Sequence, residues 1–597
     1  MELLGLIDFR RSPYSKIPQM LNTFLDTKLA QLGLTLVPLK ILHPDELTYT
    51  GVFMQPLGDL NASPDGIENA DNGIAVAKHS SFLQIANDLL VDFAMTPEYS
   101  CPWSVLLDCI NAGYLPRRGS LWVLACESIT EAQLIEFGDA HREVTWIVAE
   151  FEHDKARTFL DPLCYVFWAR SENGEFQLVV AIQFKGQPMS DHLHNLERDH
   201  MKRGVERFII RNDNDSVLLT ALICSDSLNF KENTLPQNAH IPYLILHPQL
   251  NPKPRYNAFK EYRHDAYLRS DKPEFICLNW ARGFRLPGAR ASKFGGSAYY
   301  LKSASLPPID DRLNEDHRRG LYYTISPENQ SHIFFFNYCE GVFYLHSTKA
   351  SQAAAAFRVL QNRTGPQMRR VYSWNDAAAV WSEIADTDDG FSELCNAIGT
   401  DLSPLSDVAL SILDKERLLA LSTGAFASSA QSKWFNASQL SSFQVKDDEI
   451  VKRLTVVQDP DAAAYEERFT ALSNFSYLRN AIIADKRIFP KCIADFAGVS
   501  TIQYPIENRY EFNLLKNDLS DKATVAYLGR CSAQRLNRTY DLLFEILDDP
   551  KDQVRDARRR RLVVWYERNG TIQAKWEERS DINADLSQGG NSISKEL

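Results

Sequence analysis

A cysteine at the end of an apolar run is the first residue of this sequence that could do chemistry. In the stretch "ALICSDSLNF" (221–230), Cys224 follows three apolar residues and precedes the polar stretch 225–227. The apolar run predicts a buried strand, and a cysteine in such surroundings is most often an inert packing residue. The thiolate is the nucleophile, so a reactive Cys224 needs a base or a cation beside it.

Two other apolar runs end on residues that could fill these roles. Glu98 follows the strand-like stretch "VDFAMTP", and Lys185 follows "VVAIQF". Glu197 comes twelve residues after Lys185. The order along the chain is Glu98, Lys185 and Cys224, with gaps of 87 and 39 residues. Three buried strand ends that carry these residue types by chance would give the same pattern, and this reading stays open.

The order and spacing resemble those of the nitrilase, or carbon–nitrogen hydrolase, superfamily. Members of that superfamily use a Glu–Lys–Cys triad, with each residue at the C-terminal end of a strand and the glutamate in a "PE" pair. Glu98, Lys185 and Cys224 match all three positions. The resemblance therefore implies a nitrilase-like domain with an amidase-type site.

Further positions match the family, and one departs from it. Glu197 matches the family's second glutamate, and Asp226 matches the acidic residue two positions after the cysteine. The stretch "LNWARGF…FGGSAYYLK" (278–302) resembles the family's late Asn…Gly…Gly-Ser region. Ser225 stands where many relatives carry an aromatic residue, which implies a wider or more polar pocket rim. The resemblance covers the region 30–345 and not the last 250 residues.

The resemblance implies acyl transfer through a cysteine thioester. Glu98 would take the thiol proton and later activate water, a role for which burial should raise its pKa. Lys185 and the backbone N–H of Ser225 would stabilise the oxyanion, and Glu197 would orient Lys185 or share the proton transfer. Cys224 would attack an amide or nitrile carbon, ammonia or an amine would leave, and water would release the acid. This chemistry requires no metal and no organic cofactor.

Substrate contacts can be assigned only through the family layout. By that layout Tyr99, Trp103 and His247 would contact the substrate, together with Ser225 and Asp226. Packing in the core would explain the first three residues equally well. The amide or nitrile itself cannot be named from the sequence.

Neither the histidines nor the cysteines of this sequence predict a metal site. His192, His194 and His200 cluster in "SDHLHNLERDH", but the spacing of the first two does not place them on one helical face. A solvated loop beside the active site fits this cluster better. The ten cysteines form no CxxC pair, so a metal knuckle is not predicted either.

Short strands alternate with helical segments from residue 76 onward, which predicts an α/β or layered α+β fold. Together with the resemblance, this pattern implies an α-β-β-α sandwich. Helices are predicted at "SSFLQIANDL" and at "CPWSVLLDCINAG", where Gly113 would end the helix. A hairpin is predicted around Asn173-Gly174, and the stretch 57–75, rich in Asn, Asp, Gly and Pro, is predicted to be a loop. Other strands are predicted at 32–42, 89–98, 120–128, 144–152, 241–250 and 273–281, and a strand pair around a polar turn is predicted at 205–226.

At 597 residues the chain is too long for a single core. We expect a lead (1–30), the nitrilase-like domain (31–348), a mostly helical C-terminal domain (349–585) and a disordered tail (586–597). In the C-terminal domain, apolar spacing predicts helices in "SWNDAAAVWSEIAD" and "LNRTYDLLFEIL". Asn569-Gly570 predicts a terminal hairpin.

One dense basic run, "RDARRRRL" (555–562), holds Arg558, Arg559, Arg560 and Arg561. It is either a solvated helix end beside the acidic "DDPKD" or a contact for the phosphates of RNA or DNA. The net charge of −12 argues against a general nucleic-acid coat, although not against a local basic patch.

The sequence thus leaves an enzyme and a binding module as alternatives. The enzyme would act on a small amide or nitrile, and the family's habit of pairing implies a homo-oligomer. Divergent nitrilase-like domains with large extra regions also resemble modules of bacterial antiviral systems, some of them attached to reverse transcriptases. In that case the C-terminal domain would bind a protein or nucleic acid. No signal peptide and no apolar run of membrane-spanning length is seen, so a cytoplasmic, reduced protein is expected.

Overall fold

The computed structural model divides the chain into two compact units, Met1–Leu306 with Gly320–Thr387, and Pro307–Arg319 with Asp388–Leu597. The structure describes residues 20–43, 48–189, 194–213, 216–230, 243–252, 262–263, 265–266, 273–288, 290–292, 296–302, 322–326, 331–336, 339–348, 367–384, 391–406, 410, 412–425, 454, 462–503, 512–547 and 561–577.

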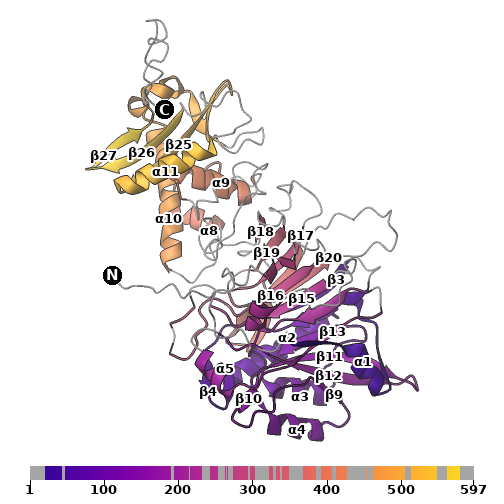
Figure 1. Cartoon of the computed structure of the whole chain (residues 1–597). Coiled ribbons are helices and arrows are strands. Elements are labelled where there is room, and N and C mark those ends of the chain that lie inside the picture. The colour runs from indigo at the N-terminus through magenta and orange to yellow at the C-terminus, as the bar shows by residue number, and fades with distance from the viewer. Residues whose placement is uncertain are drawn as a thin grey trace, which may run out of the picture. The chain divides into compact units, whose positions relative to one another are not determined.

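Two large sheets form the first unit (Figure 1). The eight-stranded sheet has the order β1 (Leu21–Phe24), β13 (Glu206–Ile210), β14 (Leu218–Ala221), β15 (Tyr243–Pro248), β16 (Glu274–Leu278), β17 (Ala298–Lys302), β19 (Ser331–Phe335) and β18 (Tyr322–Ser326). The ten-stranded sheet has the order β22 (Val380–Glu383), β21 (Gln367–Asn375), β20 (Gly341–Thr348), β3 (Thr48–Gln55), β6 (Phe93–Met95), β7 (Leu121–Ala125), β11 (Pro162–Ser171), β12 (Phe176–Phe184) and β9 (Thr145–Val148), with β2 (Leu34–Leu36) paired to β11.

Strand direction brings several C-terminal strand ends to one edge of each sheet. In the ten-stranded sheet β6 runs parallel to β7, and β12 has the same direction because β11 pairs antiparallel to both β7 and β12. In the other sheet β14, β15 and β16 are parallel. Side chains that follow these strands can therefore meet at a shared edge, as in other sheets with parallel strands.

The two sheets are joined by polar contacts between their facing sides. Gln183 in β12 donates to the carbonyl of Ala221 in β14 (3.2 Å) and accepts from the backbone N–H of Phe208 in β13 (3.0 Å). The Tyr49 and Tyr299 hydroxyls, from β3 and β17, lie 2.9 Å apart. These buried side chains hold the sheets in one alignment, because an unpaired polar group there would be costly.

Helices cover the other face of the ten-stranded sheet. Leu83 of α2 (Asn72–Asp88) and Leu106 of α3 (Trp103–Ala112) share one hydrophobic core with Trp122 of β7. The described part of the unit also includes α1 (Leu25–Gln31), α4 (Glu131–Ala140), α5 (His194–His200), the hairpin of β4 (Leu60–Ser63) and β5 (Gly66–Asn69), and the pair of β8 (Ile129–Thr130) and β10 (Phe159–Leu160).

The layered α/β fold predicted from the sequence is confirmed. A helical layer on the free face of the eight-stranded sheet is not tested, because much of the chain between β15 and β16 lies outside the described residues. The predicted helices at α2 and α3 are present, and Gly113 ends α3 in the left-handed conformation (φ +74°). The hairpin around Asn173-Gly174 joins β11 to β12.

Two local predictions for the first unit are wrong. The predicted loop 57–75 contains the β4–β5 hairpin and the start of α2, whose first turn is capped by the Asp71 carboxylate (3.0 Å from the Ile74 nitrogen). The helix predicted at 373–386 is instead the β21–β22 hairpin. There, Trp374 and Trp381 face each other across the strands with ring centroids 5.2 Å apart, and this cross-strand pair outweighs the helical spacing.

The same hairpin moves the end of the first unit. The boundary predicted at 348/349 would cut off β21 and β22, which extend the ten-stranded sheet from β20. The contact-based division lies at Thr387/Asp388 instead. Trp381 also donates its indole N–H to the carbonyl of Lys78 in α2 (2.8 Å), which fixes the hairpin to this unit.

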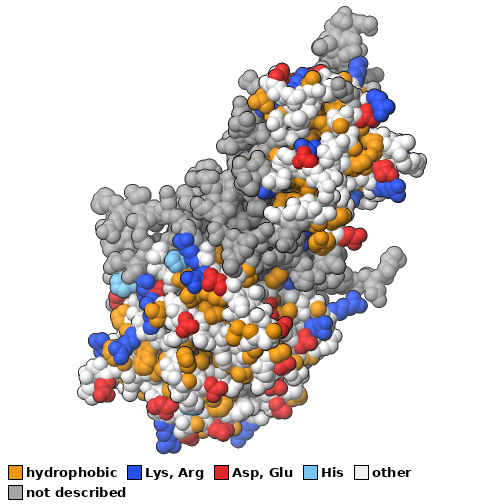
Figure 2. Space-filling model, turned by 180° about the vertical axis from the view of Figure 1, so that it is seen from behind, with side chains coloured by type: hydrophobic (Ala, Val, Ile, Leu, Met, Phe, Trp, Pro, Cys, Tyr) orange, Lys and Arg blue, Asp and Glu red, His pale blue; other side chains and the backbone are white. Residues whose placement is uncertain are grey.

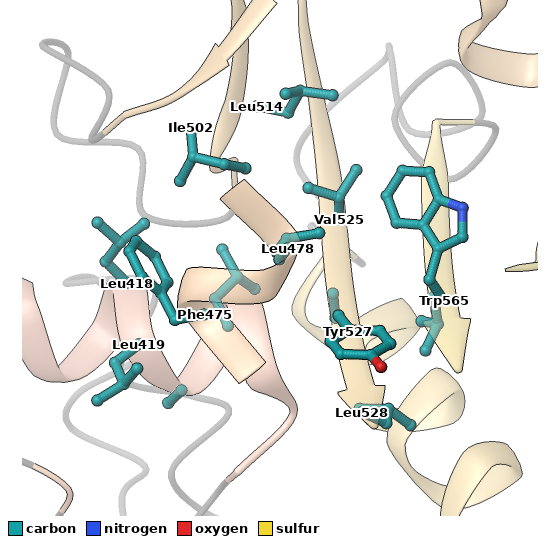
Figure 3. Packing of buried hydrophobic residues seen from close by; sticks show 14 of the residues in the cluster. Leu418, Leu419, Phe475, Leu478, Ile502, Leu514, Val525, Tyr527, Leu528 and Trp565 are labelled. Carbon is teal, nitrogen blue, oxygen red and sulfur yellow. The ribbon is translucent and has the colours of Figure 1, made fainter. Parts of the chain in front are cut away.

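The second unit is a five-stranded sheet with helices packed on it (Figure 3). Its strands are β23 (Ser500–Ile502), β24 (Leu514–Lys516), β25 (Lys522–Arg530), β26 (Leu562–Arg568) and β27 (Thr571–Lys575), and its helices include α8 (Phe391–Ile398), α9 (Ile412–Thr423), α10 (Ala462–Tyr477) and α11 (Ala533–Ile546). Figure 3 shows Leu418 of α9 and Phe475 of α10 packed toward Val525 of β25, with Trp565 of β26 on the other side of that strand.

Helical residues exceed strand residues in the described part of the second unit, as predicted, but its five-stranded sheet was predicted only as a terminal hairpin. Strands β25 and β26 are parallel, and α11 connects them, so the unit contains a β-α-β element that apolar spacing alone did not indicate. The predicted helix in "LNRTYDLLFEIL" is confirmed as α11, and the terminal hairpin at Asn569-Gly570 is confirmed as β26–β27.

Two surface properties bear on the partners considered above. Among the described residues, no helix combines the length and apolar character needed to cross a membrane. On the face shown in Figure 2, basic and acidic side chains are interspersed on the described surface and do not gather in a field of one sign.

Candidate active site

The strand ends singled out in the sequence meet in the first unit. Glu98 lies three residues after β6, Lys185 directly follows β12, and Cys224 lies three residues after β14 and begins a short 3-10 helix, η3 (Cys224–Asn229). The Lys185 Nζ is 2.6 Å from the Glu98 Oε1. Both side chains are fully buried, and Cys224 is 1% exposed. The ten-stranded sheet thus supplies the carboxylate and the ammonium, and the eight-stranded sheet supplies the thiol.

The ammonium of Lys185 lies among three carboxyl groups. Besides Glu98 it contacts both oxygens of Glu197 (2.9 and 3.0 Å), and the Asp161 Oδ2 lies 3.7 Å away. Burial by itself lowers the pKa of Lys185, but the charges of Glu197 and Glu98 outweigh burial and raise this pKa well above its usual value. Lys185 is therefore a permanent cation in a site without solvent, as an oxyanion donor needs to be.

Glu98 is the carboxyl group with contacts to both the ammonium and the thiol. Its Oε2 accepts from the backbone N–H of Leu250 (2.6 Å), and its backbone carbonyl accepts from the indole of Trp280 (2.8 Å). Burial raises the pKa of Glu98; Lys185 opposes this rise, and a hydrogen bond with the Cys224 thiol opposes it further. A raised pKa in contact with a thiol is the property that a general base requires.

The Cys224 thiol is protonated at rest. Burial and the nearby Glu98 charge raise its pKa well above the ordinary value, while Lys185 acts in the opposite direction. The thiol therefore depends on a base for activation. Its backbone has a positive φ of +41°, which is unfavourable for any residue with a Cβ atom.

His247 holds the backbone of the nucleophile. Its Nε2 lies 2.8 Å from the Cys224 carbonyl oxygen, which assigns the proton to Nε2, and its Nδ1 accepts from the Tyr262 hydroxyl (2.7 Å). Burial lowers the pKa of His247 to about 3, so the ring is neutral. The sequence predicted a substrate contact here, whereas these two bonds are made within the protein.

Ser225 and Asp226 tie the nucleophile to the chain that follows Lys185. The Ser225 hydroxyl donates to the carbonyl of Gln187 (2.5 Å). The Asp226 Oδ1 accepts from the backbone N–H groups of Gly186 (2.9 Å) and Gln187 (2.8 Å). Their role as substrate contacts stays a prediction, and the geometry gives both a part in fixing the distance between thiol and ammonium.

Of the two aromatic residues predicted near the substrate, the structure brings only Tyr99 to the site. The Tyr99 hydroxyl donates to the Glu197 Oε1 (3.0 Å), and its backbone is left-handed (φ +56°). Trp103 packs in the core between α3 and the sheet, and its indole donates to the carbonyl of Glu127 (2.9 Å). That core does not contain Cys224.

Three groups at the site were missed in the sequence: Asp161, the Trp280 indole and the Leu250 backbone. A signal for Asp161 was present. It lies twelve residues before Asn173, and Lys185 lies twelve residues after it, so a hairpin at Asn173 places them opposite each other. The Lys185 N–H does donate to the Asp161 carbonyl (3.0 Å). A backbone donor such as that of Leu250 leaves no trace in the sequence.

The carboxyl groups also bear on the expectation of no metal. Glu98, Asp161 and Glu197 place one oxygen each within 4.8 Å of one another, a spacing that suits a cation. The Lys185 ammonium is the cation bound there. Of the histidine cluster, His192 lies outside the described residues, and only the backbone of His194 is described, in α5.

The arginine run in the second unit is described at one residue. Arg558, Arg559 and Arg560 lie outside the described residues, so a nucleic-acid contact stays a prediction. Arg561 forms an ion pair with Asp521 and lies 5.6 Å from the ring centroid of Phe496. This arginine is engaged within its own unit.

Comparison with models of protein families and with curated proteins finds no match. Among solved structures, the chain is similar to a glutamine-dependent NAD(+) synthetase from Cytophaga hutchinsonii, with 10% identity and a TM-score of 0.24. The match covers 87% of this chain and 65% of the length of that protein. At this TM-score the likeness carries no argument, so function has to be argued from the site.

Proposed function

We propose that the first unit hydrolyses a non-peptide carbon–nitrogen bond, in an amide or a nitrile, through a thioester on Cys224. The observation that carries the proposal is the buried pair of the Glu98 carboxyl group with the Lys185 ammonium (2.6 Å), at the strand ends where the buried Cys224 also lies. Each partner comes from a different strand end. A nucleophile, its base and a cation for the developing oxyanion are the minimum set for acyl transfer.

In the acylation half on an amide, Glu98 removes the proton from the Cys224 sulfur as the sulfur bonds to the carbonyl carbon. A nitrile would first form a thioimidate with the sulfur and take up one water molecule, which gives the same tetrahedral intermediate. The oxyanion of the tetrahedral intermediate is stabilised by the Lys185 ammonium and by the backbone N–H of Ser225, at the start of η3. The C–N bond then breaks, and the leaving nitrogen takes the proton that Glu98 received. Ammonia or an amine departs, and the acyl group remains on sulfur.

In the deacylation half, Glu98 acts on water. It removes a proton from a water molecule that attacks the thioester carbon, and Lys185 again stabilises the oxyanion. Collapse breaks the C–S bond, releases the carboxylic acid and returns a proton to the Cys224 sulfur. Glu98 ends each half in its starting state, as a general acid–base group must.

The test is turnover and covalent trapping on the full chain. Wild type, Cys224→Ser and a control at another buried cysteine, Cys109→Ser in α3, are incubated with a panel of amides and nitriles. Ammonia release and the mass of the intact protein are then measured. We expect wild type and the control to release ammonia and to gain an acyl mass, and Cys224→Ser to do neither while keeping its circular dichroism.

Two results would contradict the proposal. Ammonia release that persists in Cys224→Ser would assign the chemistry to another group. An acyl mass located by peptide mapping on a cysteine other than Cys224 would show that a different thiol is the nucleophile.

A further inference from the structure

A third carboxyl group at the site, Asp161, has no part in the mechanism above. It lies directly before β11 and is fully buried. Within the part of the chain that the structure describes, neither of its oxygens accepts a hydrogen bond from an N–H or O–H group. The nearest cation is the Lys185 Nζ, at 3.7 Å, which is too far for a hydrogen bond.

The charges of the cluster do not balance if every group is ionised. Lys185 supplies one positive charge, whereas Glu98, Glu197 and Asp161 would supply three negative charges, and all four side chains are fully buried. An uncompensated charge in such a place is costly, and a buried carboxyl group takes up a proton instead. The cluster therefore keeps a proton at neutral pH.

The hydrogen bonds indicate where this proton lies. Glu197 is surrounded by donors, namely the Lys185 ammonium, the Tyr99 hydroxyl and the Met189 backbone N–H, so it is best occupied by a carboxylate. Glu98 also accepts from two donors, Lys185 and Leu250. Asp161 accepts from none among the described residues and lies beside Glu98.

Electrostatics agrees with this assignment. Burial and the neighbouring Glu98 charge raise the pKa of Asp161 well above the ordinary value. Burial raises the pKa of Glu98 as well, and the two carboxyl groups interact directly. Two carboxyl groups this close titrate as a pair, so the first proton belongs to both.

We propose that Asp161 and Glu98 hold one proton between them at neutral pH, and that Asp161 is the positioning residue that retains it. With the proton on Asp161, Glu98 is left ionised and free to accept the proton of the Cys224 thiol. The transfer moves one proton from Cys224 Sγ to a Glu98 oxygen, and the Asp161 proton stays in place. The transfer of the thiol proton to Glu98 rests on the proposed function, whereas the shared proton of Asp161 and Glu98 does not.

The groups that face Asp161 come from every element around the site. They are Glu98 and Tyr99 after β6, Lys185 after β12 and Glu197 in α5. Lys185 and Tyr99 have pKa values raised well above their usual ranges, so neither changes charge near neutral pH. The shared proton of the Asp161–Glu98 pair is then what distinguishes the folded from the unfolded chain in this cluster near neutral pH.

The first test measures stability against pH and needs no substrate. A carboxyl group with a raised pKa in the folded state stabilises the fold at low pH, and this contribution is lost as the pH rises toward the folded pKa. Between pH 5.5 and 7.5 the unfolded carboxyl group is ionised. The unfolding constant of wild type, relative to that of Asp161→Asn, should therefore rise about tenfold per pH unit.

Unfolding in urea is followed by deuterium exchange of peptides from β11 and β12, so that only the first unit reports. Glu98→Gln should show the same relative slope as Asp161→Asn, because either variant removes the shared proton. Asp139→Asn, at an exposed carboxylate of α4, is the matched control and should show no slope. If Asp161→Asn does not fold, Asp161→Ala removes the same titratable carboxyl group and should give the same slope.

The second test separates the two carboxyl groups through the thiol. Labelling of Cys224 by iodoacetamide at pH 7 should continue in Asp161→Asn, where Glu98 is still a base. It should fall on the order of 100-fold in Glu98→Gln, which lacks the base. We therefore expect Asp161→Asn and Glu98→Gln to give equal slopes of stability against pH but different rates of Cys224 labelling.

Two results would overturn the proposal. A flat ratio between wild type and Asp161→Asn across this pH range would show that Asp161 is ionised and holds no proton. An equal loss of labelling in both variants would show that Asp161 takes part in the proton transfer itself. If Cys224 resists labelling even in wild type, the proposed chemistry fails, whereas the stability slope still decides whether the shared proton exists.

Discussion

Strand β6 carries a buried carboxyl group at each end, and the two are satisfied in opposite ways. Asp92, before the strand, accepts from the Thr50 backbone N–H (2.8 Å) and hydroxyl (3.0 Å) and forms ion pairs with Arg117 and Lys40. Glu98, after the strand, shares its single ammonium with two other carboxyl groups. Both side chains are fully buried.

The difference shows that burial of a carboxyl group does not by itself indicate function. Asp92 is surrounded by donors and cations, so its negative charge is compensated within the protein. The Glu98 end has more carboxyl groups than cations, and the proposed shared proton removes part of this excess of negative charge. A proton held between groups of similar affinity can be transferred, which is what general acid–base chemistry needs. An incomplete set of donors around a buried acid is the informative feature.

The largest effect is expected when the cation beside Glu98 is removed, in comparison with removal of a cation beside Asp92 at the other end of β6. Lys185→Met leaves three buried carboxyl groups without a cation and should cost about 3–5 kcal/mol of unfolding free energy at pH 7. This cost should shrink toward pH 5, because protonation neutralises the carboxyl groups. Urea unfolding of the first unit at both pH values measures it.

Lys40→Met is the matched control at the Asp92 end. Lys40 is 39% exposed in its side chain, and Arg117 remains beside Asp92, so the loss should stay below about 1 kcal/mol. Equal losses for the two lysines would mean that the two ends of β6 do not differ as described.

The second comparison replaces one carboxylate at each end by its amide. Glu98→Gln should lower turnover on the order of 100-fold or more, with stability kept or increased, because a base is lost and an excess charge is removed. Asp92→Asn should do the reverse, with turnover kept and a loss of about 1–3 kcal/mol, because its donors lose a charged acceptor. Ammonia release and urea unfolding on the same samples decide. If both variants lost only activity, or both lost only stability, the two carboxyl groups would not differ in role as described.

The third comparison concerns two buried neutral histidines, one at the site and one away from it. Burial lowers the pKa of His247 to about 3 and that of His79, in α2, to about 4. Both depressed values mean that the unfolded chain binds more protons in acid. The contribution of each neutral histidine to the unfolding free energy is therefore fully present above pH 6.5. It is lost as the pH falls, by about 1.4 kcal/mol per pH unit for each ring.

Glutamine at either position should flatten this acid loss to a similar extent between pH 6 and 4.5. Only His247→Gln should also slow the labelling of Cys224, because only His247 contacts the carbonyl of the nucleophile. Slower labelling in His79→Gln as well would mean that the effect reflects general loosening of the unit.

The smallest effect is expected for an ion pair at the surface of the second unit. The Arg561 and Asp521 side chains are 33% and 27% exposed. Because solvent screens such a pair, Arg561→Gln should change the unfolding free energy of this unit by less than about 1 kcal/mol. A loss as large as that of Lys185→Met would remove the distinction between buried and exposed cations on which the comparison depends.

The sequence predicted the strand ends of the site because each carries a reactive residue after an apolar run. Glu98, Lys185 and Cys224 needed only a correct order and a correct strand direction to meet. Asp161 was predictable in principle from the mirror position across the hairpin at Asn173, which requires register and not just pattern.

Other features depended on contacts that spacing does not encode. The stretch 373–386 has helical periodicity, yet the pairing of Trp374 with Trp381 and the contact with α2 make it a hairpin. In the second unit β25 and β26 are buried along most of their length, so they show little of the polar–apolar alternation that predicts a strand. His247 was predicted as a substrate contact, which stays a prediction, and its bond to the Cys224 backbone carbonyl could not be foreseen from residue type.

Two residues of the site have backbones that favour glycine, the nucleophile Cys224 with φ +41° and Tyr99 with φ +56°. A side chain in this conformation lowers stability, and glycine would relieve the cost. Laboratory evolution for heat tolerance alone would therefore find its gains at the positions that supply the nucleophile and the donor to Glu197. In this chain, substitutions that raise stability at these two positions would remove the side chains on which the proposed reaction depends.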